Sequence, residues 1–132
     1  MALGDYESAY QSFRRAYEIQ ADVEAISREL AGVCLELGRF DEAVEVARSS
    51  AGLAPDNAEV LGNLSVALLM AGDMDLARKS IDAAIRIDPG DQINKNVKRI
   101  IGQVASGKRP APSKLSDLTK PIPRKKPFWK FW

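Results

Sequence analysis

The chain has 132 residues, enough for one small domain, and its apolar and charged fractions of 45% and 28% are ordinary for a globular protein. It contains no histidine and a single cysteine, which removes the commonest general base and any cysteine pair for a metal site. Composition therefore argues against an enzyme, a metal site or a bound cofactor.

The net charge of +1 hides two oppositely charged parts. Residues 107–132 contain eight basic residues and one acidic residue, a charge of +7, so residues 1–106 carry a charge of −6. No run of 18 apolar residues predicts a transmembrane helix, and the start of the chain, 1–5, is too short and too acidic for a secretory signal. We expect a cytoplasmic protein, either peripheral to a membrane or within a larger complex.

Apolar residues recur at the helical period through most of the chain, and they predict six helices. In the first helix Tyr6, Phe13 and Tyr17 fall on one side, and the pair Pro89-Gly90 separates the last two helices. The expected ranges are 5–20, 23–37, 40–53, 58–71, 74–87 and 91–106.

Residues 58–91 form one complete unit of two helical halves, with a helix stop and start at Gly72-Asp73 between them. A shift of 34 residues reproduces the pattern of this unit, since Leu30 then aligns with Leu64 and Gly38 with Gly72. The chain is therefore built from repeats, with partial units at both ends.

In the length of its repeat and in the residues that separate its helices, the chain resembles the tetratricopeptide repeat family over about residues 3–106. The most specific stretches are LGRFDEA at 37–43 and LAPDN at 53–57. The pattern departs from the family at Ser27 and Leu61, where a large aromatic residue is usual. The resemblance implies a non-enzymatic scaffold for protein–protein interaction.

The implied fold is an all-α right-handed solenoid of about six antiparallel helices with an extended C-terminal tail. The array would occupy residues 1–106, and residues 107–132 would be a basic, proline-rich linker and an aromatic tail. Within the array we expect a half repeat at 3–23, full repeats at 24–57 and 58–91, and a half repeat or C-terminal helix at 92–106.

In this family the first helices of the repeats line an inner groove, and carrying this over by register gives a mostly apolar surface here. Such a surface suits a partner peptide or amphipathic helix with apolar anchors. The alternative is that Leu35, Val66 and Leu69 only pack between helices. A clamp for a peptide's terminal carboxylate is disfavoured, because Gly32 and Val66 replace expected polar groups. The implied groove residues are Arg28, Leu35, Glu36, Glu59, Val66, Leu69, Met70, Ile93, Asn96, Ile100 and Val104.

One cysteine and two glycines lie inside the predicted helices of the inner groove. Cys34 is at a core-facing position, which favours a small buried hydrophobe over a reactive thiol. Gly32 and Gly62 each cost up to about 1 kcal/mol against alanine within a helix. We therefore expect close packing or an open groove at these two glycines.

The half repeats at the two ends lack their partner helices. For the first, either the chain is cut from a longer array or another molecule completes the repeat. The last helix carries an apolar stripe from Ile93 to Val104 that one neighbouring helix cannot fully cover. The candidates to cover it are the chain's own tail, another copy or the removed remainder of a partner. One hypothesis is self-association, in which the first helix of one copy packs on the last helix of another.

The end of the tail combines basic and aromatic residues, which predicts an anchor rather than a passive linker. We expect it to dock to a second protein of the same assembly, because its charge complements an acidic array. The alternative is a peripheral membrane adaptor, in which the tail tethers the array to anionic lipid. Nucleic acid is disfavoured, because an acidic array repels phosphate. The expected anchor residues are Arg124, Lys125, Lys126, Phe128, Trp129, Lys130, Phe131 and Trp132.

Overall fold

The computed structural model describes residues 3–119, which fold into six α-helices and one short 3-10 helix. The helix boundaries lie within a few residues of the predicted ones, and residues 3–119 contain no strand. The six-helix prediction is thus confirmed. The elements are α1 (Leu3–Ile19), α2 (Glu24–Glu36), α3 (Phe40–Leu53), α4 (Ala58–Met70), α5 (Met74–Ile87), α6 (Gln92–Ala105) and η1 (Leu115–Thr119).

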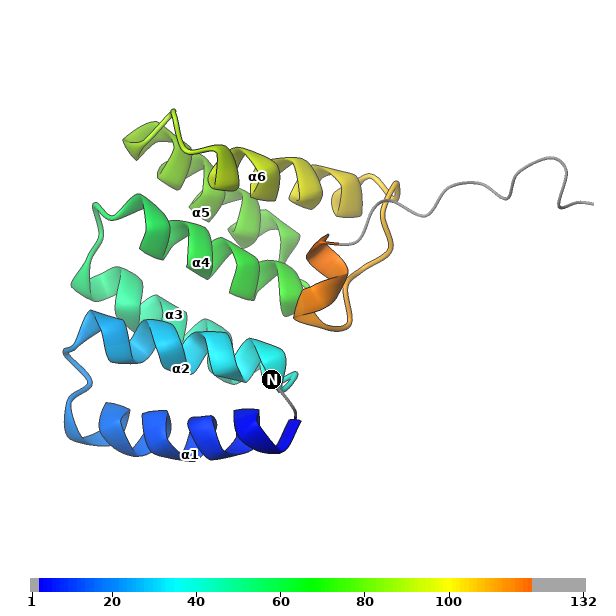
Figure 1. Ribbon diagram of the computed structural model, residues 1–132. Coiled ribbons are helices and arrows are strands. Elements are labelled where there is room, and N and C mark those ends of the chain that lie inside the picture. Colours follow the sequence, from blue (N-terminus) through cyan, green and yellow to red (C-terminus); the bar gives the residue numbers. More distant parts are fainter. Residues whose placement is uncertain (1–2, 120–132) are drawn as a thin grey trace, which may run out of the picture.

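The helices stack in two layers, with α2, α4 and α6 in one layer and α3 and α5 behind them (Figure 1). Each helix packs on the next one along the chain, and α4 also contacts α2 and α6. This nearest-neighbour packing is the arrangement of an all-α solenoid. We call the side of the molecule formed by α2, α4 and α6 the inner face.

The turns between paired helices depend on glycine. Gly38 and Gly72 have φ angles of 76° and 89°, a region that side-chain-bearing residues rarely adopt. The next residue then donates its N–H back to the preceding helix, Arg39 to the Cys34 carbonyl at 2.8 Å and Asp73 to the Leu68 carbonyl at 2.9 Å. These bonds satisfy carbonyl groups that the helix ends would otherwise leave unpaired.

The core runs through all six helices, and α4 lies at its centre. Alanine is fully buried at Ala43, Ala67, Ala77 and Ala84, each with 0% exposure. Small side chains at these positions let neighbouring helices approach closely, as the repeat pattern requires. Among residues 3–119, no helix combines the length and the hydropathy needed to cross a membrane.

Helix α1 is held against the first full repeat by a polar network. The Arg39 guanidinium lies 4.1 Å from the centre of the Tyr10 ring and donates to both carboxylate oxygens of Glu7, at 3.1 and 3.0 Å. The Tyr10 hydroxyl donates to Glu42 at 2.7 Å, and this bond raises the pKa of Tyr10 above its ordinary value. The half repeat is therefore fixed to the start of α3 as well as to α2.

Part of the segment after α6 folds back onto the array, which differs from the extended linker that the sequence predicted. Leu115 and Leu118 pack against the hydrophobic core, and Arg109 is only 7% exposed. The prolines before η1 rule out a long helix there, but they leave room for a single 3-10 turn. The expected tail anchor, residues 124–132, lies outside the described residues.

Candidate binding face

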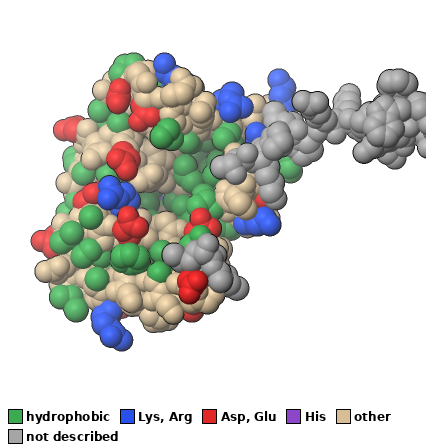
Figure 2. All heavy atoms as spheres, viewed as in Figure 1, with side chains coloured by type: hydrophobic (Ala, Val, Ile, Leu, Met, Phe, Trp, Pro, Cys, Tyr) green, Lys and Arg blue, Asp and Glu red, His purple; other side chains and the backbone are tan. Residues whose placement is uncertain are grey.

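The inner face is apolar toward its middle and polar at its edges. Figure 2 shows hydrophobic side chains gathered in a hollow over the middle of this face, with charged side chains around it. Half-buried apolar side chains of the inner layer include Val66 of α4 and Val104 of α6, which pack against the buried core. The surface offers apolar contact area that the fold itself leaves partly open.

The predicted groove residues divide into three groups by exposure. Arg28, Val66 and Val104 are half-buried. The deeply buried group is Leu35, Leu69, Met70 and Ile100, at 7%, 1%, 5% and 9% exposure. The exposed group is Glu36, Glu59, Ile93 and Asn96, with Ile93 at 74% exposure. Leu35 and Leu69 thus contribute mainly to packing between helices, which is the alternative that the sequence left open for them.

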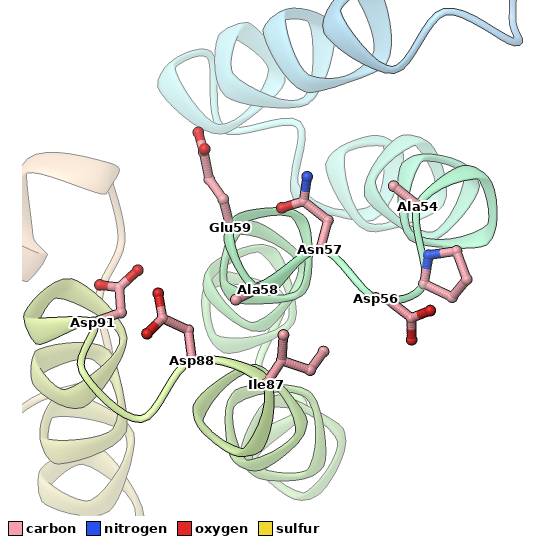
Figure 3. Close-up of a pocket in the computed structure, with 9 residues that line it drawn as sticks. Ala54, Asp56, Asn57, Ala58, Glu59, Ile87, Asp88 and Asp91 are labelled. Carbon is pink, nitrogen blue, oxygen red and sulfur yellow. The ribbon is translucent and has the colours of Figure 1, made fainter.

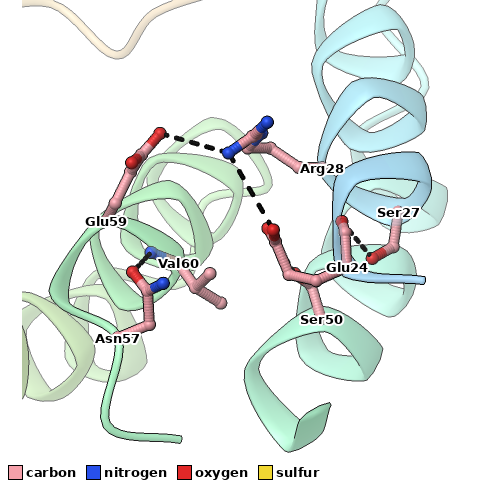
Figure 4. A network of polar contacts seen from close by, with 7 residues as sticks. All are labelled: Glu24, Ser27, Arg28, Ser50, Asn57, Glu59 and Val60. Carbon is pink, nitrogen blue, oxygen red and sulfur yellow. Dashed lines mark hydrogen bonds and ion pairs between the residues drawn. The ribbon is translucent and has the colours of Figure 1, made fainter. Parts of the chain in front are cut away.

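The arginine of the inner face is already paired. Arg28 Nη1 lies 3.6 Å from Glu59 Oε1 and 3.9 Å from Glu24 Oε2, so it bridges α2 and α4 (Figure 4). The Ser50 hydroxyl donates to Glu24 at 3.4 Å from the neighbouring helix. Two carboxylates therefore compete with any anionic ligand for Arg28.

A residue that sequence reasoning missed closes the contact between α4 and α6. Asn94 is 3% exposed, and its Nδ2 donates to the Ala58 carbonyl at 3.3 Å. Its side chain lies where a Cβ on Gly62 would be, with Cγ at 3.2 Å from that position. Gly62 is therefore a close-packing glycine. Gly32 has nothing within 4 Å of the equivalent position, so it belongs to the open part of the face.

The sequence carried one signal for this contact. A shift of 34 residues aligns Asn94 with Val60, which is 2% exposed in α4. A polar residue at a register position that is otherwise apolar predicts a specific buried hydrogen bond. The sequence does not identify the acceptor of that bond, however, because the Ala58 carbonyl belongs to the backbone of another repeat.

The loops at the N-terminal ends of α4 and α6 enclose a shallow acidic hollow of about 640 Å³ (Figure 3). Two of its polar side chains are used by the fold. The Asn57 side chain accepts from the Val60 N–H at 3.1 Å, and Asp91 accepts from the N–H groups of Ile93 and Asn94 at 2.8 and 3.2 Å. These are helix caps. Within residues 3–119, no group of three acidic or cysteine side chains could hold a metal ion.

Cys34 is fully buried, with 0% exposure. Burial raises the pKa of its thiol to about 12, and the nearby Glu42 carboxylate adds to the shift. The thiolate is the reactive form of cysteine, so the environment of Cys34 is that of a packing residue, as its core-facing position indicated.

Two models of the tetratricopeptide repeat family match the sequence, one over residues 1–52 and the other over residues 35–92. Together they span α1 to α5 and reach the start of α6, and the structure has the paired antiparallel helices of such repeats. The chain therefore belongs to the tetratricopeptide repeat family.

Proposed function

We propose that this chain is a non-enzymatic scaffold whose inner face binds a peptide or helix of a partner protein through apolar contacts. Tetratricopeptide repeats generally mediate protein–protein interaction, which supports the broader part of the proposal. The finer part rests on the chemistry of the inner face itself.

The observation that carries the proposal is the combination of an apolar hollow with a neutralised arginine. Val66 and Val104 offer partly open apolar surface, and Arg28 is held between Glu24 and Glu59. A ligand gains free energy here by burying apolar side chains, at about 25 cal/mol per Å² of apolar surface. A ligand that relied on its charge would have to displace an existing ion pair.

A selection from a random-peptide display library on the full chain tests this proposal. Peptides that bind the inner face should lose about tenfold or more in affinity for Val66→Asp, because a carboxylate in an apolar contact costs more than 1 kcal/mol. Arg78→Gln is the matched control, since it makes the same charge change at Arg78, which is exposed on α5 in the other layer. Peptides that bind all three proteins equally would overturn the proposal.

We further propose that the basic aromatic tail docks to a second protein of the same assembly. The support is the charge of +7 in residues 107–132 against −6 in the rest of the chain, with four aromatic residues among the last five. The alternative is that the tail tethers the array to an anionic membrane surface.

Self-association through the half repeats is also a proposal. In such an association a second copy would pack against α6, where Lys95, Lys98 and Arg99 are exposed. A second copy packing there would have to cover these positive charges, of which that of Lys98 is paired with Asp82 at 2.9 Å. Light scattering at high micromolar concentration decides whether copies associate.

A further inference from the structure

The segment that follows α6 is held against the helical array by specific contacts. After α6 the chain turns at Gly107, where φ is 79°. The Arg109 backbone N–H then donates to the Gln103 carbonyl at 3.1 Å, and the Arg109 side chain donates from Nε to Gln103 Oε1, also at 3.1 Å. Among the described residues, Arg109 is the one charged residue that is buried, with 7% exposure. Burying a guanidinium is unfavourable unless it is hydrogen-bonded, so these contacts fix the segment in place.

The segment ends in a turn with its own internal support. Asp117 accepts from the Ser113 N–H at 3.0 Å, the Ser113 hydroxyl at 3.1 Å and the Lys114 N–H at 3.3 Å. These bonds cap the short helix η1 at its start. Leu115 and Leu118, three residues apart, then project from the same side of one turn and pack against the core.

The short helix η1 lies at the inner face. Figure 1 shows η1, in orange, beside the C-terminal end of α4, which belongs to the inner layer. That end of α4 carries Leu69 and Met70, which were expected in the groove and belong to the hydrophobic core against which Leu115 and Leu118 pack. The segment therefore lies against the end of the surface on which a partner would bind.

We infer that residues 109–119 are a built-in occupant of the inner face, and that the partner it binds presents the same chemistry: a short helical turn with two leucine-like side chains three residues apart. The inference rests on the proposed function. It specifies the kind of ligand, and it adds that the ligand must displace the chain's own segment. A tethered segment competes at an effective concentration on the order of millimolar, so only a partner with additional contacts displaces it.

The test uses a fluorescent synthetic peptide of residues 107–119, GKRPAPSKLSDLT, and measures its Kd by anisotropy. The full-length variant Leu115→Asp/Leu118→Asp is expected to bind this peptide about tenfold or more tightly than the wild-type chain does, because its own segment no longer competes. The control variant Ala111→Asp/Lys114→Gln makes the same charge change at exposed positions of the segment, and it should behave as wild type.

Amide hydrogen exchange checks that the variant is opened and still folded. The N–H groups of Arg109, Ser113 and Lys114 should exchange faster in Leu115→Asp/Leu118→Asp than in wild type, while α2 to α5 keep their protection. We call Leu115→Asp/Leu118→Asp the opened variant. The inference would be overturned if wild type and the opened variant bound the peptide with equal affinity. It would also be overturned if the opened variant were folded and did not bind the peptide.

The display-selected peptides separate failure of this inference from failure of the proposed function. If they depend on Val66 but bind wild type and opened variant equally well, the inner face binds partners and the segment does not compete with them. If no selected peptide depends on Val66, the proposed function itself fails. Peptides that depend on Val66 and bind the opened variant more tightly support both.

Discussion

Two glycines lie inside helices of the inner layer, and their surroundings are opposite. Gly32 in α2 has open space where a Cβ would be, whereas Gly62 in α4 faces the Asn94 side chain. Helix propensity alone favours alanine over glycine by about 1 kcal/mol at both positions. The difference between them is therefore a contact between repeats and not a local preference.

We expect Gly32→Ala to raise the free energy of unfolding by about 0.5–1 kcal/mol. Gly62→Ala should lower it by about 1 kcal/mol, because the new methyl group pushes Asn94 away from the Ala58 carbonyl. Urea denaturation of both variants measures the two changes. A gain in stability for Gly62→Ala, equal to that of Gly32→Ala, would contradict this account of the α4–α6 contact.

The thiol of Cys34 should react only when the chain opens. A shift of its pKa from 9.0 to about 12 lowers the thiolate fraction at pH 8 by about a thousandfold. We expect alkylation by iodoacetamide to be far slower in the native chain than in concentrated guanidinium chloride. Rapid labelling of the folded chain would show instead that Cys34 is exposed.

The same shift has a consequence for stability at alkaline pH. The folded pKa is higher than the unfolded one, so the unfolded chain loses the thiol proton first as pH rises. The contribution of Cys34 to stability is complete below pH 9 and is lost between pH 9 and about 12. Comparing wild type with Cys34→Ala across this window isolates that loss from the titration of tyrosine and lysine.

At the scale of the helices, the caps are unevenly distributed. Asp73 caps α5 by accepting from the Leu76 N–H at 3.1 Å, and α4 and α6 have similar caps. The N-cap position of α2 is occupied by Val23, whose side chain cannot accept a hydrogen bond. Its φ and ψ angles of −91° and 109° already suit a capping residue.

We therefore expect Asp73→Ala to lower the free energy of unfolding by about 1 kcal/mol, and Val23→Ser to raise it by about 0.5–1 kcal/mol. Thermal or urea denaturation measures both changes. Asp75→Ala is the control, because Asp75 lies in the first turn of the same helix without a capping bond among those described, and it should change stability by only a few tenths of a kcal/mol. Equal losses for Asp73→Ala and Asp75→Ala would mean that charge, and not the capping bond, matters.

The helices and their turns could be predicted from the sequence because their causes are local. The 34-residue spacing and glycines such as Gly38 and Gly72 define each repeat without knowledge of distant contacts. The docked segment could not be predicted in this way, since its prolines favour extended structure. Its signal was the three-residue spacing of Leu115 and Leu118, which has meaning only once an apolar surface exists for them.

The candidate binding face could be predicted only in outline. Repeat register identified the inner layer correctly, but it did not separate the buried Leu69 from the half-buried Val66. That separation depends on which side chains of neighbouring helices cover each residue, and α4 contacts helices from α2 to α6. Contacts between repeats, such as Asn94 with Ala58, are likewise invisible to a comparison of one repeat with the next.

At the scale of the whole molecule, the basic tail distinguishes two ways of localising the array. If it docks to a protein, anionic vesicles should pellet the full chain no more than they pellet the variant Trp129→Ala/Trp132→Ala. A membrane tether would pellet in a tryptophan-dependent way and be released by salt, because its basic residues act through screened charge. Co-sedimentation at low and high ionic strength therefore decides between the two.

The central claim is that partners bind the inner face in exchange for the chain's own segment. Amide hydrogen exchange of the full chain, with and without a display-selected peptide, tests both halves of this claim in one measurement. The account predicts added protection in α2, α4 and α6, together with lost protection at Arg109, Ser113 and Lys114. Added protection in α3 and α5 alone, or an undisturbed segment at 109–119 when the peptide is bound, would contradict it.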